Sequence, residues 1–195
     1  MKRIFLIGLF ALLSACSQAP NQGQAQGGFV GTDITGADFA KPLALTDHAG
    51  KKRTMSDFAG KVVVLFFGYT HCPDVCPTTM ADMKNAMKLL GDKSDQVQVL
   101  FVTVDPQRDT QEVLAQFVPV FDKRFIGLWG SEQETAETLA NFKIYSSKVP
   151  GQTEGVYTID HSAGTYVFDK SGKVRLYMEY GQKPADIASD LSKLL

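Results

Sequence analysis

Several features that would identify other protein classes are scarce in this chain of 195 residues. It has three cysteines, three histidines and a formal net charge of −1. A charge so near zero gives no reason to expect nucleic-acid binding. The apolar stretch at residues 4–13 is too short to span a bilayer. Internal repeats and a second domain are not evident, and 44% hydrophobic residues suffice for one domain with a core.

The N-terminus has the organisation of a targeting segment. Two basic residues precede the apolar stretch at residues 4–13. The sequence Leu13-Ser-Ala-Cys16 resembles the bacterial lipobox, in which cleavage precedes the cysteine and that thiol is acylated. We therefore expect residues 1–15 to be a lipoprotein signal peptide and Cys16 to carry lipid. An ordinary secretory signal with a cysteine there by chance is the alternative.

A tether and one folded domain are expected after the signal. Residues 17–28 are rich in Gln, Gly, Ala and Asn and bury too little apolar surface to fold. We expect a flexible tether at 16–28 and a domain at 29–195. Acyl chains would anchor it to a membrane of the bacterial cell envelope, on the extracytoplasmic (periplasmic) side, where disulfides persist. Whether that membrane is the inner or the outer one stays open.

Apolar periodicity predicts alternating strands and helices. Residues 62–67 and 97–104 have the length and the β-branched and aromatic bias of strands buried on both faces. Between them, apolar residues recur three and four apart up to Gly91, which predicts an amphipathic helix. The other expected elements are a hairpin at 43–55, a helical turn near 56, a helix at 110–121, a short strand at 125–129, a helix at 131–142, a polar loop at 146–158, a hairpin of 162–169 with 173–180, and a helix from 184.

This order indicates an α/β protein. A strand–helix–strand unit followed by an antiparallel hairpin and a helix is the thioredoxin-like arrangement. An N-terminal hairpin extension and an inserted helix are additions to it. Three methionines, Met80, Met83 and Met87, share the face of the first helix. They could form a methionine copper site, but their spacing alone favours core packing.

Cys72 and Cys76 follow the first buried strand, where strand gives way to helix. Ligands bind at this end of the strands in open α/β sheets. If both cysteines lie on the first helical turn, their Cβ atoms are about 5–6 Å apart, which is wide for an unstrained disulfide. Free N–H groups and the helix dipole lower the pKa of thiols at such a position. We expect redox chemistry or binding of a soft metal ion rather than a structural disulfide, which would close only a small loop.

The three histidines have different expected roles. His48 lies in a polar turn and is expected to be solvated. His71 adjoins Cys72, so its side chain should point away from that thiol. His161 begins the predicted C-terminal hairpin, whose start faces the cysteine loop in a thioredoxin-like fold. We therefore expect His161 to be the partner of the cysteines.

Two thiolates and one imidazole favour copper. Thiolates suit Cu(I), and imidazole allows Cu(II) to bind as well. A structural zinc site would normally need a fourth protein ligand, and the domain has no third cysteine. We expect one copper ion per monomer, in either oxidation state.

Three motifs carry a more specific resemblance: Phe67-Gly-Tyr-Thr-His-Cys-Pro-Asp-Val-Cys-Pro77, Val104-Asp-Pro-Gln-Arg-Asp-Thr110 and Asp160-His-Ser162. Together and in this order they resemble the signatures of the Sco (SenC) family, over roughly residues 39–195. The resemblance implies a thioredoxin-like fold that binds Cu(I) and Cu(II). It also implies a partner, the copper-site subunit of cytochrome c oxidase or another copper or thiol acceptor, whose binuclear centre such proteins help to assemble.

The resemblance also assigns residues. It implies copper ligands at Cys72, Cys76 and His161. It implies supporting positions beside the site at Asp74, Asp105 and Arg108. The simpler interpretation of these three is turn capping and a surface ion pair, worth ~0–1 kcal/mol if exposed. The expected lipid anchor on Cys16 differs from the family pattern, since many relatives carry a transmembrane helix instead.

Two enzyme hypotheses compete with a copper carrier. The first is a thiol–disulfide oxidoreductase, with a role in redox or oxidative-stress defence, using Cys72 as nucleophile and Cys76 as resolving thiol. Thioredoxins place a cis-proline beside the disulfide, and residues 159–162 contain no proline. The second is a peroxiredoxin-like peroxidase, which would keep Thr or Ser where this chain has Tyr69. Neither pattern favours an enzyme over a metallochaperone.

Overall fold

A computed structural model describes residues 28–39 and 43–195. The predicted signal peptide, Cys16 and almost all of the predicted tether lie outside the described residues. The strands are β1 (Thr32–Asp33), β2 (Ala44–Asp47), β3 (Lys52–Thr54), β4 (Val62–Gly68), β5 (Val97–Thr103), β6 (Ile126–Trp129), β7 (Ser146–Pro150), β8 (Tyr157–His161), β9 (Thr165–Phe168) and β10 (Val174–Met178). The helices are α1 (Val75–Leu90), α2 (Gln111–Phe117), α3 (Glu132–Asn141) and α4 (Pro184–Ser192), with 3₁₀ turns at Met55–Phe58, Gly91–Gln96 and Val118–Val120.

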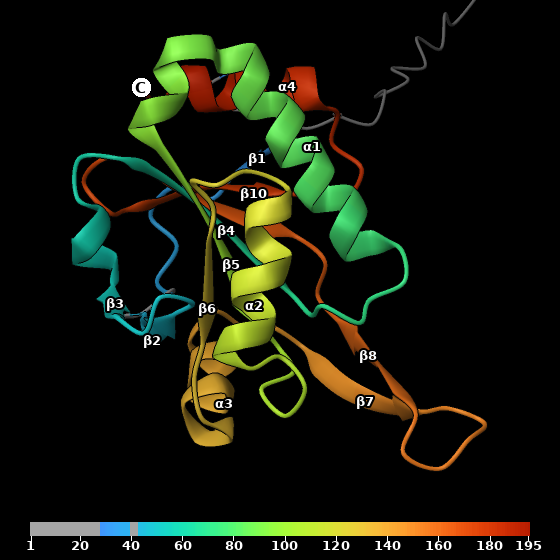
Figure 1. Ribbon diagram of the computed structural model, residues 1–195. Coiled ribbons are helices and arrows are strands. Elements are labelled where there is room, and N and C mark those ends of the chain that lie inside the picture. Colours follow the sequence, from blue (N-terminus) through green and yellow to red (C-terminus); the bar gives the residue numbers. More distant parts are fainter. Residues whose placement is uncertain (1–27, 40–42) are drawn as a thin grey trace, which may run out of the picture.

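Eight strands form one mixed sheet in the order β1-β10-β9-β4-β5-β6-β2-β3. Strands β4, β5 and β6 are parallel, and β9 runs antiparallel beside β4. The crossovers β4–α1–β5 and β5–α2–β6 advance in the same direction, so right-handed connections place α1 and α2 over the same face. Helix α4 packs against α1 (Figure 1). The predicted thioredoxin-like arrangement is confirmed, with β2–β3 as the N-terminal hairpin and α2 with β6 inserted.

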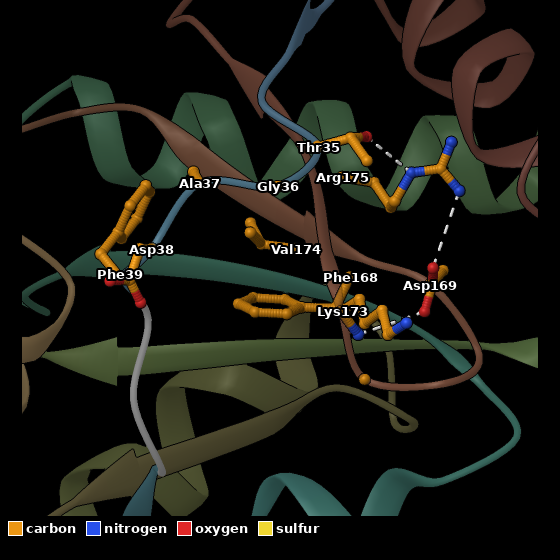
Figure 2. A pocket seen from close by; sticks show the side chains of 11 residues that line it. Thr35, Gly36, Ala37, Asp38, Phe39, Phe168, Asp169, Lys173, Val174 and Arg175 are labelled. Carbon is orange, nitrogen blue, oxygen red and sulfur yellow. Dashed lines mark hydrogen bonds and ion pairs between the residues drawn. The ribbon is translucent and has the colours of Figure 1, made fainter.

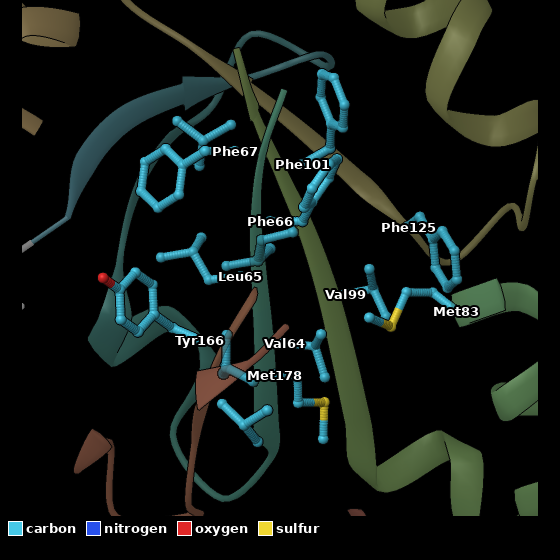
Figure 3. Close-up of a cluster of buried hydrophobic side chains, with 14 of the residues drawn as sticks. Val64, Leu65, Phe66, Phe67, Met83, Val99, Phe101, Phe125, Tyr166 and Met178 are labelled. Atoms are coloured by element: carbon cyan, nitrogen blue, oxygen red, sulfur yellow. The ribbon is translucent and has the colours of Figure 1, made fainter. Parts of the chain in front are cut away.

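The central strands are buried on both faces, as their composition predicted. Every residue of β4 and β5 is buried. Phe66 packs on Phe101 of the neighbouring strand, with ring centroids 6.0 Å apart (Figure 3). On the opposite face, Phe67 packs on Phe142, 5.4 Å away. These layers fix the end of β4 and therefore the start of the cysteine loop.

The methionine face of α1 belongs to this core. Met80, Met83 and Met87 are each at most 3% exposed and are packed among apolar side chains. The core interpretation is therefore confirmed. Cys76 lies at the start of the same buried face and is the residue of that face with a thiol that can bind a metal.

Three expectations about the elements were wrong. Residues 146–158 are not a loop, because β7 and β8 pair with each other as a separate two-stranded sheet. His161 ends β8 and does not begin the C-terminal hairpin, which consists of β9 and β10. The predicted helix at 110–121 stops at Phe117, and Pro119 lies in a 3₁₀ turn because proline cannot continue the helical hydrogen-bond pattern. Strand β1 was not expected.

Within the described residues, the helices are too short or too polar to cross a membrane.

Helix α3 begins with a capping box that gives one pH-dependent prediction. The Glu134 carboxylate accepts hydrogen bonds from Lys52 Nζ and the Ser131 amide, both at 2.8 Å, and these lower its pKa from 4.5 to about 2. A carboxyl with a lowered pKa stabilises the fold above pH 4.5, and this contribution is lost as pH falls towards 2. Glu134→Gln should therefore cost below ~1 kcal/mol at pH 7, since Glu134 is solvent-accessible.

That difference should shrink to a small fraction of its pH 7 value near pH 2.5, and vanish below pH 2, in urea unfolding at a series of pH values. Glu137→Gln, in the same helix, is the control, since the Glu137 carboxylate accepts from Gln133 and not from a lysine or a helix-cap amide. An equal Glu134→Gln effect at pH 7 and near pH 2.5 would contradict the assignment.

Candidate metal centre

The cysteine loop, residues 69–74, joins β4 to α1. Cys76 lies in the first turn of α1, but Cys72 lies in the loop before the helix begins at Val75. The two cysteines therefore do not share the first helical turn, which the sequence analysis had considered for them. Both are free thiols; Cys76 is buried and Cys72 is partly exposed. The loop thus presents the Cys72 thiol to solvent, and the first turn of α1 presents the Cys76 thiol to the core.

Gly68 makes room for the buried thiol. A Cβ atom at this position would lie 2.9 Å from Cys76 Sγ and 3.0 Å from the Phe101 ring. Only glycine allows the end of β4 to approach the thiol so closely. This burial raises the pKa of Cys76, because a thiolate would lose its hydration. The expectation that the helix terminus lowers the thiol pKa is therefore wrong for Cys76, whose desolvation outweighs the helix dipole.

His161 contacts the buried thiol, as expected for the partner of the cysteines, but it does so from β8 and not from the C-terminal hairpin. Its Nε2 lies 3.7 Å from Cys76 Sγ. Its Nδ1 donates to the Ser162 carbonyl oxygen at 2.9 Å, which leaves the lone pair on Nε2. Burial lowers the pKa of His161 and favours the neutral imidazole. A neutral ring whose other nitrogen is held by a carbonyl is the usual form of a metal-ligating histidine.

Cys72 completes the donor set but not in a preassembled geometry. Its Sγ accepts a hydrogen bond from the Cys76 amide at 3.4 Å. Within residues 28–39 and 43–195, no three His, Cys, Asp or Glu side chains already form a group able to hold a metal ion. Two sulfurs and one imidazole nitrogen nevertheless fit a copper ion chemically. Metal binding would require the partly exposed Cys72 side chain to turn towards the Cys76–His161 pair.

Asp109 holds the cysteine loop, and we did not predict this. Its fully buried carboxylate accepts from the Thr70 amide at 3.0 Å, the Thr70 hydroxyl at 2.6 Å and the Thr103 hydroxyl at 2.7 Å. Burial raises the pKa of Asp109 despite these bonds. Asp109 thereby ties the loop before Cys72 to the end of β5. The only signal in the sequence was its place in the motif at residues 104–110.

Asp105 and Arg108 are not the surface ion pair of the simpler interpretation. The Asp105 carboxylate is fully buried and accepts from Arg108 Nε and, at 2.8 Å, from the Tyr157 hydroxyl. Arg108 Nη1 donates to the Tyr157 carbonyl oxygen at 2.9 Å. These contacts join the loop after β5 to β8, the strand that carries His161. Tyr157 was missed because its sequence context is a polar segment.

Asp74 does not cap α1 through its side chain. It stands at the N-cap position, but its carboxylate accepts no hydrogen bond from a helix amide and contacts the Thr78 hydroxyl at 3.4 Å. The residue is exposed, two positions from Cys72. The carboxylate is therefore accessible from the solvent side of the loop.

The other two histidines lie away from the thiols. The expectation that His48 is solvated was wrong. Its Nδ1 accepts a hydrogen bond from the Gly127 amide at 2.9 Å, which joins the β2–β3 turn to β6. His71 is exposed, and its Nδ1 lies 3.1 Å from the Thr70 hydroxyl and 3.9 Å from the Asp109 carboxylate. Neither contact involves a cysteine.

A cavity of about 510 Å³ lies elsewhere, between residues 35–39 and the β9–β10 hairpin (Figure 2). Phe168 and Val174 form part of its lining, and Arg175 pairs there with Asp169 at 3.6 Å. It contains no cysteine or histidine. Its chemistry therefore does not compete with the Cys76–His161 pair as a soft-metal site.

Comparisons with known proteins agree with the geometry. A family model described as SCO1/SenC matches residues 31–195. The mitochondrial SCO2 homologue of Danio rerio is 40% identical over 139 residues, which cover 70% of this chain and 48% of that protein. The chain spans about half the length of the mitochondrial relatives it matches.

Solved structures are similar over most of the domain. The structure of Bradyrhizobium japonicum ScoI with copper bound has a TM-score of 0.75 and 36% identity, covering 80% of this chain and 99% of that one. The solution structure of apo Sco1 from Thermus thermophilus has a TM-score of 0.77 and 37% identity, covering 86% and 97%. The family model, the relatives and these structures lead to one conclusion: the chain belongs to the SCO1/SenC family.

Proposed function

We propose that this protein binds copper outside the cytoplasm and assists assembly of the binuclear copper centre of cytochrome c oxidase. The observation that carries the proposal is the pair formed by Cys76 Sγ and the unprotonated Nε2 of His161, 3.7 Å apart, with Cys72 beside it. The similarity to a copper-bound ScoI structure supports the choice of metal. The ligands are Cys72, Cys76 and His161, and they hold one copper ion per monomer.

The three ligands serve the two oxidation states differently. The thiolates favour Cu(I), and the neutral imidazole of His161 adds the nitrogen that Cu(II) prefers. Since burial raises the pKa of Cys76, copper binding releases a proton from that thiol. The exposed carboxylate of Asp74 lies on the side from which an acceptor protein would approach. Delivered copper, electrons from the thiols, or both would then pass to the acceptor.

The location is also part of the proposal. The N-terminal sequence, with Leu13-Ser-Ala-Cys16 after a basic and apolar start, supports a lipid anchor on Cys16. The segment at residues 16–28 would then join this anchor to the domain. The domain would then meet membrane-bound acceptors on the extracytoplasmic side.

Titration with copper tests the proposal directly. The reduced protein is titrated anaerobically with Cu(I), and separately with Cu(II) while the thiolate-to-Cu(II) absorption is followed. One equivalent should bind in each case. A wild-type protein without charge-transfer absorption would refute the copper site.

His161→Ala should weaken Cu(II) binding by at least ~10-fold and alter its absorption, because the imidazole is lost. The two thiols should still react with a thiol reagent. His48→Ala is the matched control, since His48 bonds to Gly127 and not to the thiols. Equal Cu(II) binding by the two variants would remove His161 from the ligand set.

A thiol–disulfide oxidoreductase is the second candidate, favoured by two free thiols of unequal exposure. Cys72 is the accessible attacking thiol and Cys76 the buried resolving thiol. Fast disulfide exchange with an acceptor peptide, together with failure to bind copper, would select this function.

A further inference from the structure

His161 is carried by a strand outside the main sheet. Strand β8 pairs with β7 in a separate two-stranded sheet, and the hairpin projects from the body of the protein (Figure 1). Backbone bonds from β4 or β5 therefore do not set the position of β8. Along the strand, Tyr157, Ile159 and His161 alternate onto the less exposed face, while Thr158 and Asp160 are exposed. Side chains on that face must hold His161 in place.

Tyr157 is held at three points by two residues of the loop after β5. Its hydroxyl donates to Asp105 Oδ1 at 2.8 Å, and its carbonyl oxygen accepts from Arg108 Nη1 at 2.9 Å. The guanidinium carbon of Arg108 lies 3.6 Å from the centroid of its ring, within cation–π range. Asp105 and Arg108 are themselves paired through Nε. The start of β8 is therefore fixed in position and in rotation.

A second tyrosine, Tyr69, contacts β8 closer to the His161 imidazole. Arg108 also lies 5.8 Å from the ring of Tyr69 in the cysteine loop. The Tyr69 hydroxyl accepts from the Ile159 amide at 3.2 Å, and its ring meets His161 edge-on with centroids 5.9 Å apart. Arg108 thus contacts both Tyr157, on β8, and Tyr69, the cysteine-loop residue that contacts Ile159 and His161 of the same strand.

We propose that Asp105, Arg108 and Tyr157 form a clamp that positions His161 Nε2 against the Cys76 thiol. We name these three residues the β8 clamp. The inference rests on the proposed copper function, because it assigns the clamp a role in Cu(II) binding. Arg108 and Tyr157 are positioning residues: neither is a ligand, and both act through β8.

The clamp has a specific consequence for the two oxidation states. If the clamp is removed, Cys72 on the loop and Cys76 on α1 should keep their positions, whereas the His161 imidazole on β8 should lose its position. Cu(II) binding, which depends on His161, should weaken more than Cu(I) binding, which depends on the thiolates. A buried ion pair with a purely structural role would not distinguish between the two.

Arg108→Ala tests the clamp in the full-length protein. We expect Cu(II) affinity to fall by ~10–100-fold, as for other partners of metal ligands, with a shifted thiolate-to-Cu(II) absorption and a smaller loss for Cu(I). Tyr157→Phe removes the hydroxyl but keeps the ring under the guanidinium, so its loss should be intermediate. Amide hydrogen exchange at Ile159 reports the release of β8 without copper, and it should accelerate in the same order.

Arg53→Ala is the matched control. Arg53 pairs through Nε with the buried Asp47 at 2.7 Å, and its side chain is 21% exposed against 22% for Arg108. It lies on β3, at the far edge of the sheet. Its loss should lower stability without changing the Cu(II) absorption or the exchange of the Ile159 amide.

The outcomes are separable. Wild-type Cu(II) affinity, absorption and Ile159 exchange in both Arg108→Ala and Tyr157→Phe would overturn the clamp and leave the copper function intact. A wild-type protein that binds no copper would refute the function, and Ile159 exchange would still decide whether the clamp positions β8. If Arg108→Ala leaves an unpaired buried Asp105 and does not fold, Tyr157→Phe carries the same test.

Discussion

Replacing both thiols, in Cys72→Ser/Cys76→Ser, is expected to abolish tight binding of copper in both oxidation states. The thiolates supply two of the three proposed donors, and a serine hydroxyl is neither soft nor ionised at neutral pH. The loss should exceed the ~10–100-fold that removal of an outer partner of a metal ligand costs. Equilibrium competition with a Cu(I) chelator and the thiolate-to-Cu(II) absorption measure it.

Two further variants make this prediction specific. Cys16→Ser removes the third cysteine of the chain and should leave copper binding unchanged. Cys72→Ser changes only the partly exposed thiol, so a folded protein with weak copper binding is expected even if replacing the buried Cys76 disturbs the core. Retention of wild-type Cu(I) affinity by the double variant would refute the proposed ligands.

The central part of the fold was predictable because its sequence pattern has one physical cause. Strands β4 and β5 are predominantly apolar because both faces are covered, and the period of α1 follows from one buried face. The thioredoxin-like topology predicted from the sequence also placed His161 near the cysteine loop, although His161 was assigned to the C-terminal hairpin and not to β8. The fold therefore followed from strand and helix patterns, and the approach of His161 to the cysteines followed from the fold; its strand and its contact with Cys76 did not.

The β7–β8 hairpin was missed for the opposite reason. Its strands pair with each other and not with the main sheet, and β7 is largely exposed. Composition therefore indicated a loop. The alternation of Tyr157, Ile159 and His161 was present, but five residues carry too weak a signal beside proline and glycine.

The environment of each thiol could not be predicted from the sequence either. The spacing of Cys72 and Cys76 does not tell where the helix begins, and α1 begins between them. The burial of Cys76 depends on Gly68 and Phe101, which only the packed sheet brings together. The sequence therefore predicted the residue types of the site. It predicted the wrong direction for the pKa shift of Cys76, which burial raises.

Asp109→Ala is expected to have the largest effect of any change outside the proposed ligands. The carboxylate is the shared acceptor for the Thr70 amide, the Thr70 hydroxyl and the Thr103 hydroxyl. Alanine would leave the Thr103 hydroxyl without its acceptor in a buried environment and the two Thr70 donors in a partly buried one, at ~1–3 kcal/mol for each one left unpaired. We therefore expect the free energy of unfolding to fall by about 3 kcal/mol in urea denaturation.

The same change should reach the copper site, because Asp109 holds the loop two residues before Cys72. Copper affinity should fall even under conditions where the variant is fully folded. Asp169→Ala is the control: Asp169 also accepts three hydrogen bonds, from Ser171 and Lys173, but in an exposed turn where water can replace it. If Asp109→Ala costs no more stability than Asp169→Ala and leaves copper affinity intact, the cysteine loop is organised by its own backbone and not by the buried carboxylate.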